Sequence, residues 1–325
     1  MDENTLTRLT ALMISVLPAM VMFAYFMVVA RVSFRVEKLW SAFAFGAVIA
    51  FPCILLGQFF NWLIDLGTDP LALSLKKSIF MPAIPEELLK LVAVLILCGD
   101  ELSEIKPRRL FMMAVACGCG FACFENILYV FEVGHWQTTA IQRSLSAVPG
   151  HAFVSALMGY CIYRAVHRRA WWWGLVVIVP IACHGAYDFF LFATSNLSQA
   201  GYSVRGVYWM TWGFIACVVF EGLMAHIVLQ KLIKEEQSDD LPLGEGEEWH
   251  SRLDQIANAP FFWAITGGLS LIGTIYFTYD MRGKVGTLEV VFNQGFAVFS
   301  LLHALAFLVL MLIQLRRANR GQSPW

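Results

Sequence analysis

Long apolar stretches are the feature that most limits how this chain can fold. We count nine stretches near the roughly 20 residues that an α-helix needs to cross the hydrocarbon core of a membrane. They cover residues 9–30, 40–66, 79–98, 110–131, 148–163, 171–193, 207–230, 260–279 and 290–315. Hydrophobic residues make up 58% of the chain and charged residues 14%, and the mean hydropathy is +0.64. The sequence therefore predicts an all-α polytopic membrane protein with about nine transmembrane helices.

Basic residues set the expected orientation. With the N-terminus outside, 15 of the 23 Lys and Arg residues fall on the inside and 7 on the outside, while Lys90 lies within a span. Because Lys and Arg accumulate on the cytoplasmic side, we expect an N-out, C-in topology. The stretch at residues 9–30 follows an acidic leader without a cleavage site, so we expect a span rather than a cleaved signal.

One polar segment, residues 231–259, interrupts the apolar pattern. It carries eight acidic residues against three basic ones, together with Pro242, Gly244 and Gly246. Such a composition is typical of a solvated linker. We therefore expect a seven-span block at residues 1–230, an acidic cytoplasmic linker at 231–259, and a two-span hairpin with a basic tail at 260–325.

The eight Cys residues all lie in or beside apolar stretches, where they predict small packing residues and no disulfide framework. The run Cys117-Gly118-Cys119-Gly120 consists of small residues only. It predicts a close contact between two helices rather than a metal site.

Ionisable residues inside the expected spans carry the functional information, because a charge at bilayer depth is costly to keep. There are ten of them: Glu86, Glu87, Lys90, Glu125, His151, His184, Asp188, Glu221, His226 and His303. Glu86, Glu125, His151, His184 and Asp188 lie about 11, 9, 5, 14 and 8 Å from the outer ends of their spans, at 1.5 Å per residue. This common depth predicts one shared polar site among the third to sixth spans. Glu221, His226 and His303 lie in other spans, and we assign them to helix packing or partner contacts.

The segment Pro85-Glu86-Glu87-Leu88-Leu89-Lys90 is the most informative part of that layer. Glu86 and Lys90 are four residues apart, so they share a helix face and the ammonium lowers the cost of the buried carboxylate. Pro85 suits the first turn of a helix. If a helix begins there, Glu86 and Glu87 lie at its positive dipole end.

The other spans show matching patterns. Phe121, Glu125 and Tyr129 form a stripe at four-residue spacing on one helix face. His184 and Asp188 have the same spacing, so Asp188 can accept the ring N–H of His184 and orient it.

Carboxylates and imidazoles together indicate hydrolytic chemistry. The sequence lacks the His-Glu-x-x-His, Gly-x-Gly-Asp and Gly-x-Ser-x-Gly motifs of other hydrolases. A Glu in a poorly solvated pocket can act as a general base on water. Imidazole donors, or a metal held by Glu and His, can stabilise the oxyanion of a tetrahedral intermediate. These are the parts that peptide hydrolysis within a membrane needs.

Two other classes of protein fit some of these features. A proton-coupled transporter or channel also uses buried Glu, His and Asp, but it needs polar groups through the whole membrane thickness, and here they lie at one depth. A catalytically silent binding scaffold is the third hypothesis.

Four motifs in order carry a resemblance to a known family. They are Pro85-Glu86-Glu87-x-x-Lys90, Phe121-x-x-x-Glu125-Asn126-x-x-Tyr129, His151 with Gly159-Tyr160, and His184-x-x-x-Asp188-Phe189. Over residues 40–230 the chain resembles the PrsW family of intramembrane proteases, within the wider group of type II CAAX prenyl proteases and Abi proteins. The resemblance implies site-one cleavage of a single-pass membrane protein, such as an anti-sigma factor, on the extracytoplasmic side of the bacterial cytoplasmic membrane, in which the protease itself is embedded. The expected partners are this substrate and the bilayer, with no nucleic acid.

The motifs imply roles for eight residues. Glu86 is the expected general base, with Glu87 sharing its proton or orienting it, and Lys90 balances their charge. His151 and His184 polarise the scissile carbonyl or hold a metal. Glu125 orients water or binds the metal, and Asn126 and Asp188 support these groups. A metalloprotease would use Glu125, His151 and His184 as ligands, and the sequence leaves open whether zinc is bound.

Overall fold

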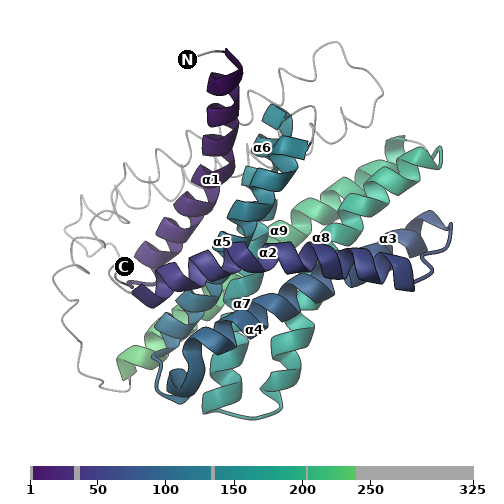
Figure 1. Cartoon of the computed structure of the whole chain (residues 1–325). Helices are drawn as coiled ribbons and strands as arrows, with labels where there is room; N and C mark the ends of the chain where they lie inside the picture. The colour runs from purple at the N-terminus through teal and green to yellow at the C-terminus, as the bar shows by residue number, and fades with distance from the viewer. Residues whose placement is uncertain (1–2, 33–36, 133–135, 203, 239–325) are drawn as a thin grey trace, which may run out of the picture.

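The computed structural model describes residues 3–32, 37–132, 136–202 and 204–238, and its regular elements over these residues are all helical (Figure 1). In chain order they are α1 (Glu3–Val29), α2 (Glu37–Leu63), α3 (Pro70–Ser78), η1 (Ile79–Ala83), α4 (Ile84–Cys98), η2 (Gly99–Ser103), α5 (Pro107–Glu132), α6 (Trp136–Leu145), α7 (Ala147–His167), α8 (Trp172–Gln199) and α9 (Val204–Ser238). The two spans expected at 260–279 and 290–315, most of the linker, and His303 lie outside the described residues.

Six helical segments are long and apolar enough to cross a membrane. They are Thr5–Val29, Glu37–Leu63, Pro107–Glu132, Trp136–His167, Trp172–Gln199 and Trp209–Glu236. Each coincides with one of the first seven expected spans, so the all-helical membrane architecture is confirmed. The described residues contain six such segments rather than the seven expected there, because the stretch at 79–98 does not qualify.

Proline residues divide that third stretch. Asp69 starts α3 by accepting a hydrogen bond from the amide of Ala72 at 2.7 Å, with Pro70 in the first turn. The chain then passes through η1, a π-helix that contains Pro82, and α-helical geometry resumes at Ile84. π-Helical turns are rare and concentrate at functional sites. Because the residue before α4 is itself helical, Glu86 and Glu87 do not lie at a free helix end, and the expected help from the helix dipole is lost.

The last described helix is longer than its apolar part. α9 continues past residue 230 to Ser238, into the segment that we expected to be linker. Two acidic residues of this extension form ion pairs with neighbouring helices. Glu236 accepts two hydrogen bonds from Arg108, both at 2.9 Å, and Glu235 accepts one from Arg164 at 2.9 Å. The C-terminal end of α9 is thereby tied to α5 and α7.

Helix α5 is the centre of the bundle. It packs against α1, α2 and α7, and every residue from Leu110 to Cys123 is buried. Glycines allow this close packing. A Cβ atom on Gly46 of α2 would overlap the backbone carbonyl of Cys117, and one on Gly120 would overlap that of Phe43. The close helix contact predicted for Cys117–Gly120 is therefore confirmed.

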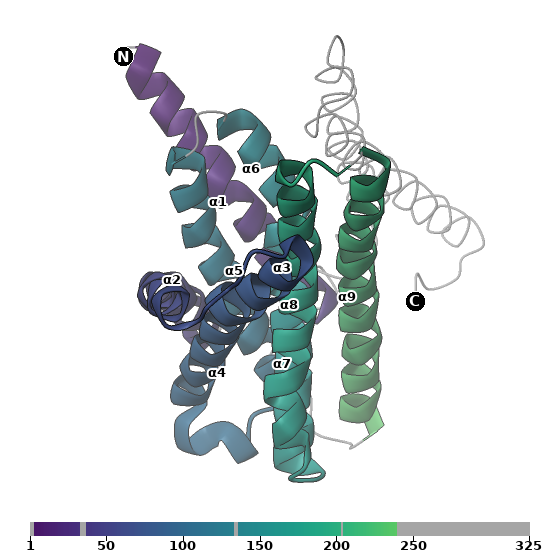
Figure 2. The same cartoon turned by 90° about the vertical axis from the view of Figure 1, so that its right-hand side faces the viewer.

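The remaining helices enclose α5. In Figure 1, α2 runs across the front of α5 and α7, and α8 and α9 lie behind. Figure 2 shows α8 and α9 running side by side along their length, while α2 is seen end-on. This arrangement brings α4, α5, α7 and α8 around one region of the bundle interior.

We expect Gly46→Ala to destabilise the bundle. Its new methyl group must push α2 away from the α5 backbone, and overpacking of this kind costs about 1–3 kcal/mol. The measurement is thermal unfolding of purified protein in detergent. Gly174→Ala on α8 is the matched control, because a Cβ atom there meets nothing within 4 Å. Equal melting temperatures for the two variants would contradict the close contact.

Candidate active site

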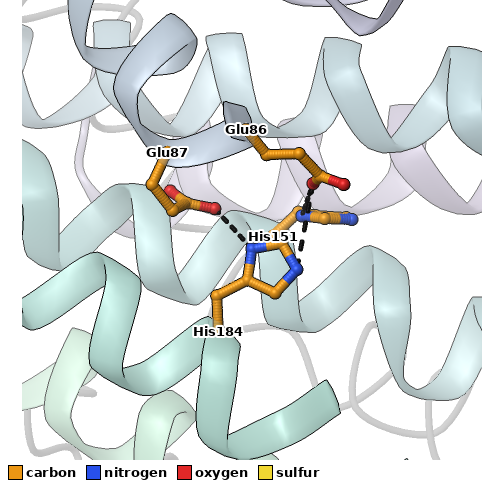
Figure 3. A group of neighbouring side chains, drawn as sticks. All are labelled: Glu86, Glu87, His151 and His184. Carbon is orange, nitrogen blue, oxygen red and sulfur yellow. Dashed lines mark hydrogen bonds and ion pairs between the residues drawn. The ribbon is translucent and has the colours of Figure 1, made fainter. Parts of the chain in front are cut away.

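The residues that the sequence singled out converge from four helices. Glu86, Glu87 and Lys90 come from α4, Glu125 and Asn126 from α5, His151 from α7, and His184 and Asp188 from α8. All of these side chains except that of Glu125 are buried, and the Glu125 side chain is 16% exposed. Figure 3 shows Glu86 and Glu87 extending from one helix towards His151 and His184.

Lys90 is the cation at the centre of the cluster. Its ammonium donates to Glu87 Oε1 at 2.8 Å and lies 3.0 Å from His151 Nδ1. An ammonium group has no acceptor site, so Nδ1 of His151 is the acceptor. The other ring nitrogen must then carry the proton, and it donates to Glu125 Oε2 at 2.7 Å. Lys90 and Glu125 together therefore set the tautomer of His151.

An aromatic ring closes the site around this ammonium. Lys90 is fully buried, and its Nζ lies 4.2 Å from the centre of the Phe121 ring. Phe121 also packs edge-on against His151, with ring centres 5.2 Å apart. The cation–π contact adds to the ion pair in compensating a charge that has no access to solvent.

His184 is held between two carboxylates. Its Nδ1 lies 2.7 Å from Glu87 Oε1, and its Nε2 lies 3.0 Å from Asp188 Oδ2. The contact expected from the four-residue spacing of His184 and Asp188 is thus present. Donation to both acceptors at once requires a proton on each ring nitrogen.

Glu86 has a buried oxygen that makes no hydrogen bond but lies among three cationic or hydrogen-bonding groups. Its Oε2 is buried and lies 3.6 Å from Lys90 Nζ, 3.8 Å from His184 Nε2 and 4.0 Å from His151 Nδ1. The sequence paired Lys90 with Glu86, but the shorter contact goes to Glu87. Glu86 is therefore left with a free oxygen surrounded by cationic or hydrogen-bonding groups.

Arg143 of α6 is a site residue that sequence reasoning missed. Its Nε donates to Asn126 Oδ1 and its second guanidinium nitrogen to Glu125 Oε2, both at 2.7 Å. The guanidinium also lies 4.0 Å from the centre of the Tyr129 ring. We counted Arg143 as an outside-loop cation because α6 precedes the apolar stretch at 148–163. It instead holds Glu125 in place.

Glu221 of α9 is the second residue that was missed. It is 1% exposed, and neither of its carboxylate oxygens has a hydrogen-bond partner in the described part of the chain. It lines a small cavity together with His151 and His184. A single acidic residue in a separate span gave no signal in the sequence beyond its rarity there.

Four residues fit a metal ion. Glu86, Glu87, His151 and His184 each offer one ligand atom, and these atoms all lie within 4.8 Å of one another. Glu86 and Glu87 each retain one buried oxygen without a partner, which is the kind of vacancy that a bound cation satisfies. Carboxylate and imidazole are ordinary zinc ligands. The donor set therefore fits zinc, provided that Lys90 releases His151 Nδ1 and that His184 loses the proton of its ligating nitrogen.

Glu125, which the sequence allowed either to orient water or to bind a metal with His151 and His184, is not among these four residues. It lies on the far side of His151, where it accepts the Nε2 proton. A carboxylate in that position orients a metal-binding His and raises its basicity.

Comparison with known proteins supports this chemistry. The family model described as PrsW family intramembrane metalloprotease matches residues 35–224, which is more than half of the chain. This chain belongs to the PrsW family. All the site residues described above lie within the matched segment. The chain is accordingly an intramembrane protease and an integral membrane protein.

Several bacterial relatives agree. The chain is 30% identical over 165 residues to Protease PrsW of Bacillus subtilis (strain 168), covering 50% of this chain and 72% of that protein. It is 30% identical over 181 residues to Protease PrsW of Shouchella clausii (strain KSM-K16), covering 54% and 80%. It is 26% identical over 128 residues to Protease PrsW of Clostridioides difficile (strain 630), covering 37% and 48%. No solved structure matches the chain.

Zinc binding distinguishes the ligand set with Glu125 from the one without it. We expect His151→Ala to abolish zinc binding, because it removes a ligand. Glu125→Gln should weaken binding by only about 10–100-fold, as is usual for a group that orients a ligand. The measurement is zinc titration of purified protein in detergent with a competing chelator. If Glu125→Gln abolishes binding as completely as His151→Ala, Glu125 is itself a ligand.

Proposed function

We propose that this PrsW family member cleaves a peptide bond of a membrane protein, with Glu86 as the general base that activates water. The observation that carries the proposal is the free Oε2 of Glu86, which lies within 4.0 Å of Lys90, His151 and His184. Glu87, Glu125 and Asp188 are already engaged in contacts with Lys90, His151 and His184. Glu86 alone combines a central position with a carboxylate oxygen that faces a cation and two imidazoles.

The surrounding groups suit the steps of hydrolysis. Glu86 accepts a proton from water as the water attacks the scissile carbonyl, and it then returns the proton to the leaving amine. The Nε2–H of His184 lies 3.8 Å from Glu86 Oε2, and it can exchange its contact with Asp188 for one with the oxyanion that develops on the carbonyl oxygen. Glu87 and Asp188 keep the His184 ring in this orientation. Lys90 compensates the negative charge of Glu86 and Glu87 throughout.

A metal ion, when held by Glu87, His151 and His184, would supply Lewis-acid polarisation of the carbonyl and a more acidic water, and would leave Glu86 as the base. The family description as a metalloprotease and the fit of the donor set support zinc. Glu125 and Arg143 hold His151 in position in either case.

The substrate and its location follow from the orientation expected from the sequence. With the N-terminus outside, the site lies in the outer leaflet, so the substrate would be a membrane protein cut near the extracytoplasmic surface. By resemblance to the family, we propose a single-pass protein of the anti-sigma-factor type. The bacterial cytoplasmic membrane is the corresponding location.

Glu86→Gln should abolish cleavage without unfolding the protein. Loss of a general base costs about 10²–10⁴-fold in rate, and the amide keeps the shape of the side chain. The assay combines the purified protein in proteoliposomes with a panel of single-pass membrane proteins and follows cleavage on gels. Glu101→Gln is the matched control, because Glu101 makes an exposed ion pair with Lys38 away from the site. A Glu86→Gln protein that still cuts its substrate would exclude Glu86 as the base.

Removal of metal should stop cleavage if zinc participates. We expect a strong chelator to abolish the activity and stoichiometric zinc to restore it, because the metal would polarise the carbonyl. The readout is the initial rate of cleavage before chelation, after chelation and after zinc is returned. Full activity in chelator would show that no metal stabilises the oxyanion and would leave this role to the imidazoles.

A further inference from the structure

Among the residues that the structure describes, Glu221 is a buried acid beside the site that the proposed mechanism does not use. It reaches the site from α9, whereas the eight residues identified from the sequence come from α4, α5, α7 and α8. Its side chain is 1% exposed, and both carboxylate oxygens lack a hydrogen-bond partner among the described residues. A buried carboxyl group without partners is costly, so a bound water that donates hydrogen bonds to it would be stabilising.

A cavity lies where that molecule would sit. It is enclosed by α7, α8 and α9, and its wall includes Gly150, His151, His184, Tyr187 and Glu221. The space available for the centre of a water molecule is about 10 Å³. This is close to the smallest volume that holds one water, and it excludes a larger ligand.

Glycine at position 150 keeps this cavity open. A Cβ atom there would point towards the wall opposite, 3.9 Å from Glu221 Oε2 and 3.9 Å from Tyr187 Cε2. Both are ordinary van der Waals distances, so no steric overlap requires glycine at this position. The side chain of alanine would instead take up the space beside Glu221.

We propose that Glu221 holds a water molecule in this cavity against the imidazoles of His151 and His184, and that this water supplies the hydrolytic site from the α9 side. The cavity wall is mostly apolar, but Glu221 contributes a carboxyl group with two unpartnered oxygens beside the rings of His151 and His184, and there is room for one water. Tyr187 contributes little to it, because its hydroxyl already donates to Ser146. Glu221 is thus a positioning residue, since it acts on the reaction through water.

This inference rests on the proposed function, because a water supply matters only if the site hydrolyses its substrate. A buried hydrolytic site needs a source of water. The catalytic cluster is buried, and each turnover consumes one water that must come from somewhere other than the lipid. The Glu221 carboxyl group, next to the two imidazoles, provides a polar site that can bind the water used in the next turnover.

Four variants test the inference through kinetics. Glu221→Leu removes the polar anchor, and Gly150→Ala fills the cavity while favouring the helix. Both should lower kcat by about 10-fold or more with KM changed less than about twofold, because substrate contacts remain. Glu221→Gln can still bind water and should retain activity within about threefold. Gly174→Ala on α8 is the control, with nothing within 4 Å of the new Cβ atom, and should match the wild type.

A second measurement detects the water without using catalysis. Synchrotron X-ray footprinting labels side chains next to bound water, and we expect Tyr187 to be labelled in the wild type and Glu221→Gln. Labelling of Tyr187 should fall several-fold in Glu221→Leu and Gly150→Ala. If the wild-type protein cleaves nothing, the proposed function fails, while the labelling still tests the water site.

Either of two results would overturn the inference. Unchanged kcat in Gly150→Ala and Glu221→Leu would show that the cavity does not supply the reaction. An equal loss of kcat in Glu221→Gln and Glu221→Leu, with labelling of Tyr187 unchanged in both, would assign a role to the charge of Glu221 rather than to a bound water.

Discussion

The buried ammonium of Lys90 is the interaction on which the rest of the site depends. It lies in the protein interior without solvent, and it meets Glu87, Glu86, His151 and the Phe121 ring. A charge in such a place is tolerated only when it is paired and hydrogen-bonded. Lys90 pairs most closely with Glu87. Glu87 therefore accepts its hydrogen bond, while Glu86 keeps an oxygen without a hydrogen-bond partner. By donating to His151, Lys90 also fixes which nitrogen of that ring carries a proton.

This network requires the helices to approach closely, and the small residues of α5 allow them to do so. Gly118 is the clearest case, because a Cβ atom there would lie 2.6 Å from the backbone carbonyl of His151 and would also overlap Ser155. His151 could not then lie as near to Lys90. The same helix carries Phe121 and Glu125 at four-residue spacing, so the packing face and the functional face of α5 are continuous. The stability of the bundle and the geometry of the site therefore depend on one set of backbone contacts.

Much of the site could be predicted from the sequence, and the reason is physical. Polar groups in an apolar medium have few partners except one another, so a common depth in four helices predicted that Glu86, Glu125, His151 and His184 would meet. Helix spacing predicted the contact between His184 and Asp188 for the same reason. The π-helix before Glu86 was not predictable in this way, because hydropathy does not report backbone geometry. Consequently the third stretch was taken as a full span with a helix end at the carboxylates.

Other parts of the site were missed because their signals are weak in a single sequence. Arg143 lies on a short helix whose composition resembles a loop, so charge counting placed it outside. Glu221 stands alone in its span, and its depth was not compared with the others. The choice of Lys90 between Glu86 and Glu87 depends on side-chain rotamers, which spacing along a helix cannot distinguish. In each case the missing information was a contact between elements rather than a property of one element.

The charge balance of the completed site links these residues to its chemistry. Five carboxyl groups converge there, from Glu86, Glu87, Glu125, Asp188 and Glu221, against two permanent cations, Lys90 and Arg143. An interior of low dielectric cannot hold three uncompensated negative charges. The balance has to come from protons on the imidazoles and carboxyl groups, or from a divalent cation. Binding of a divalent metal here would release such protons. Either the bound metal or the bound protons can therefore balance the negative charge of the cluster. The excess of carboxyl groups makes the site costly to bury, and the same carboxyl groups can accept and donate protons during hydrolysis.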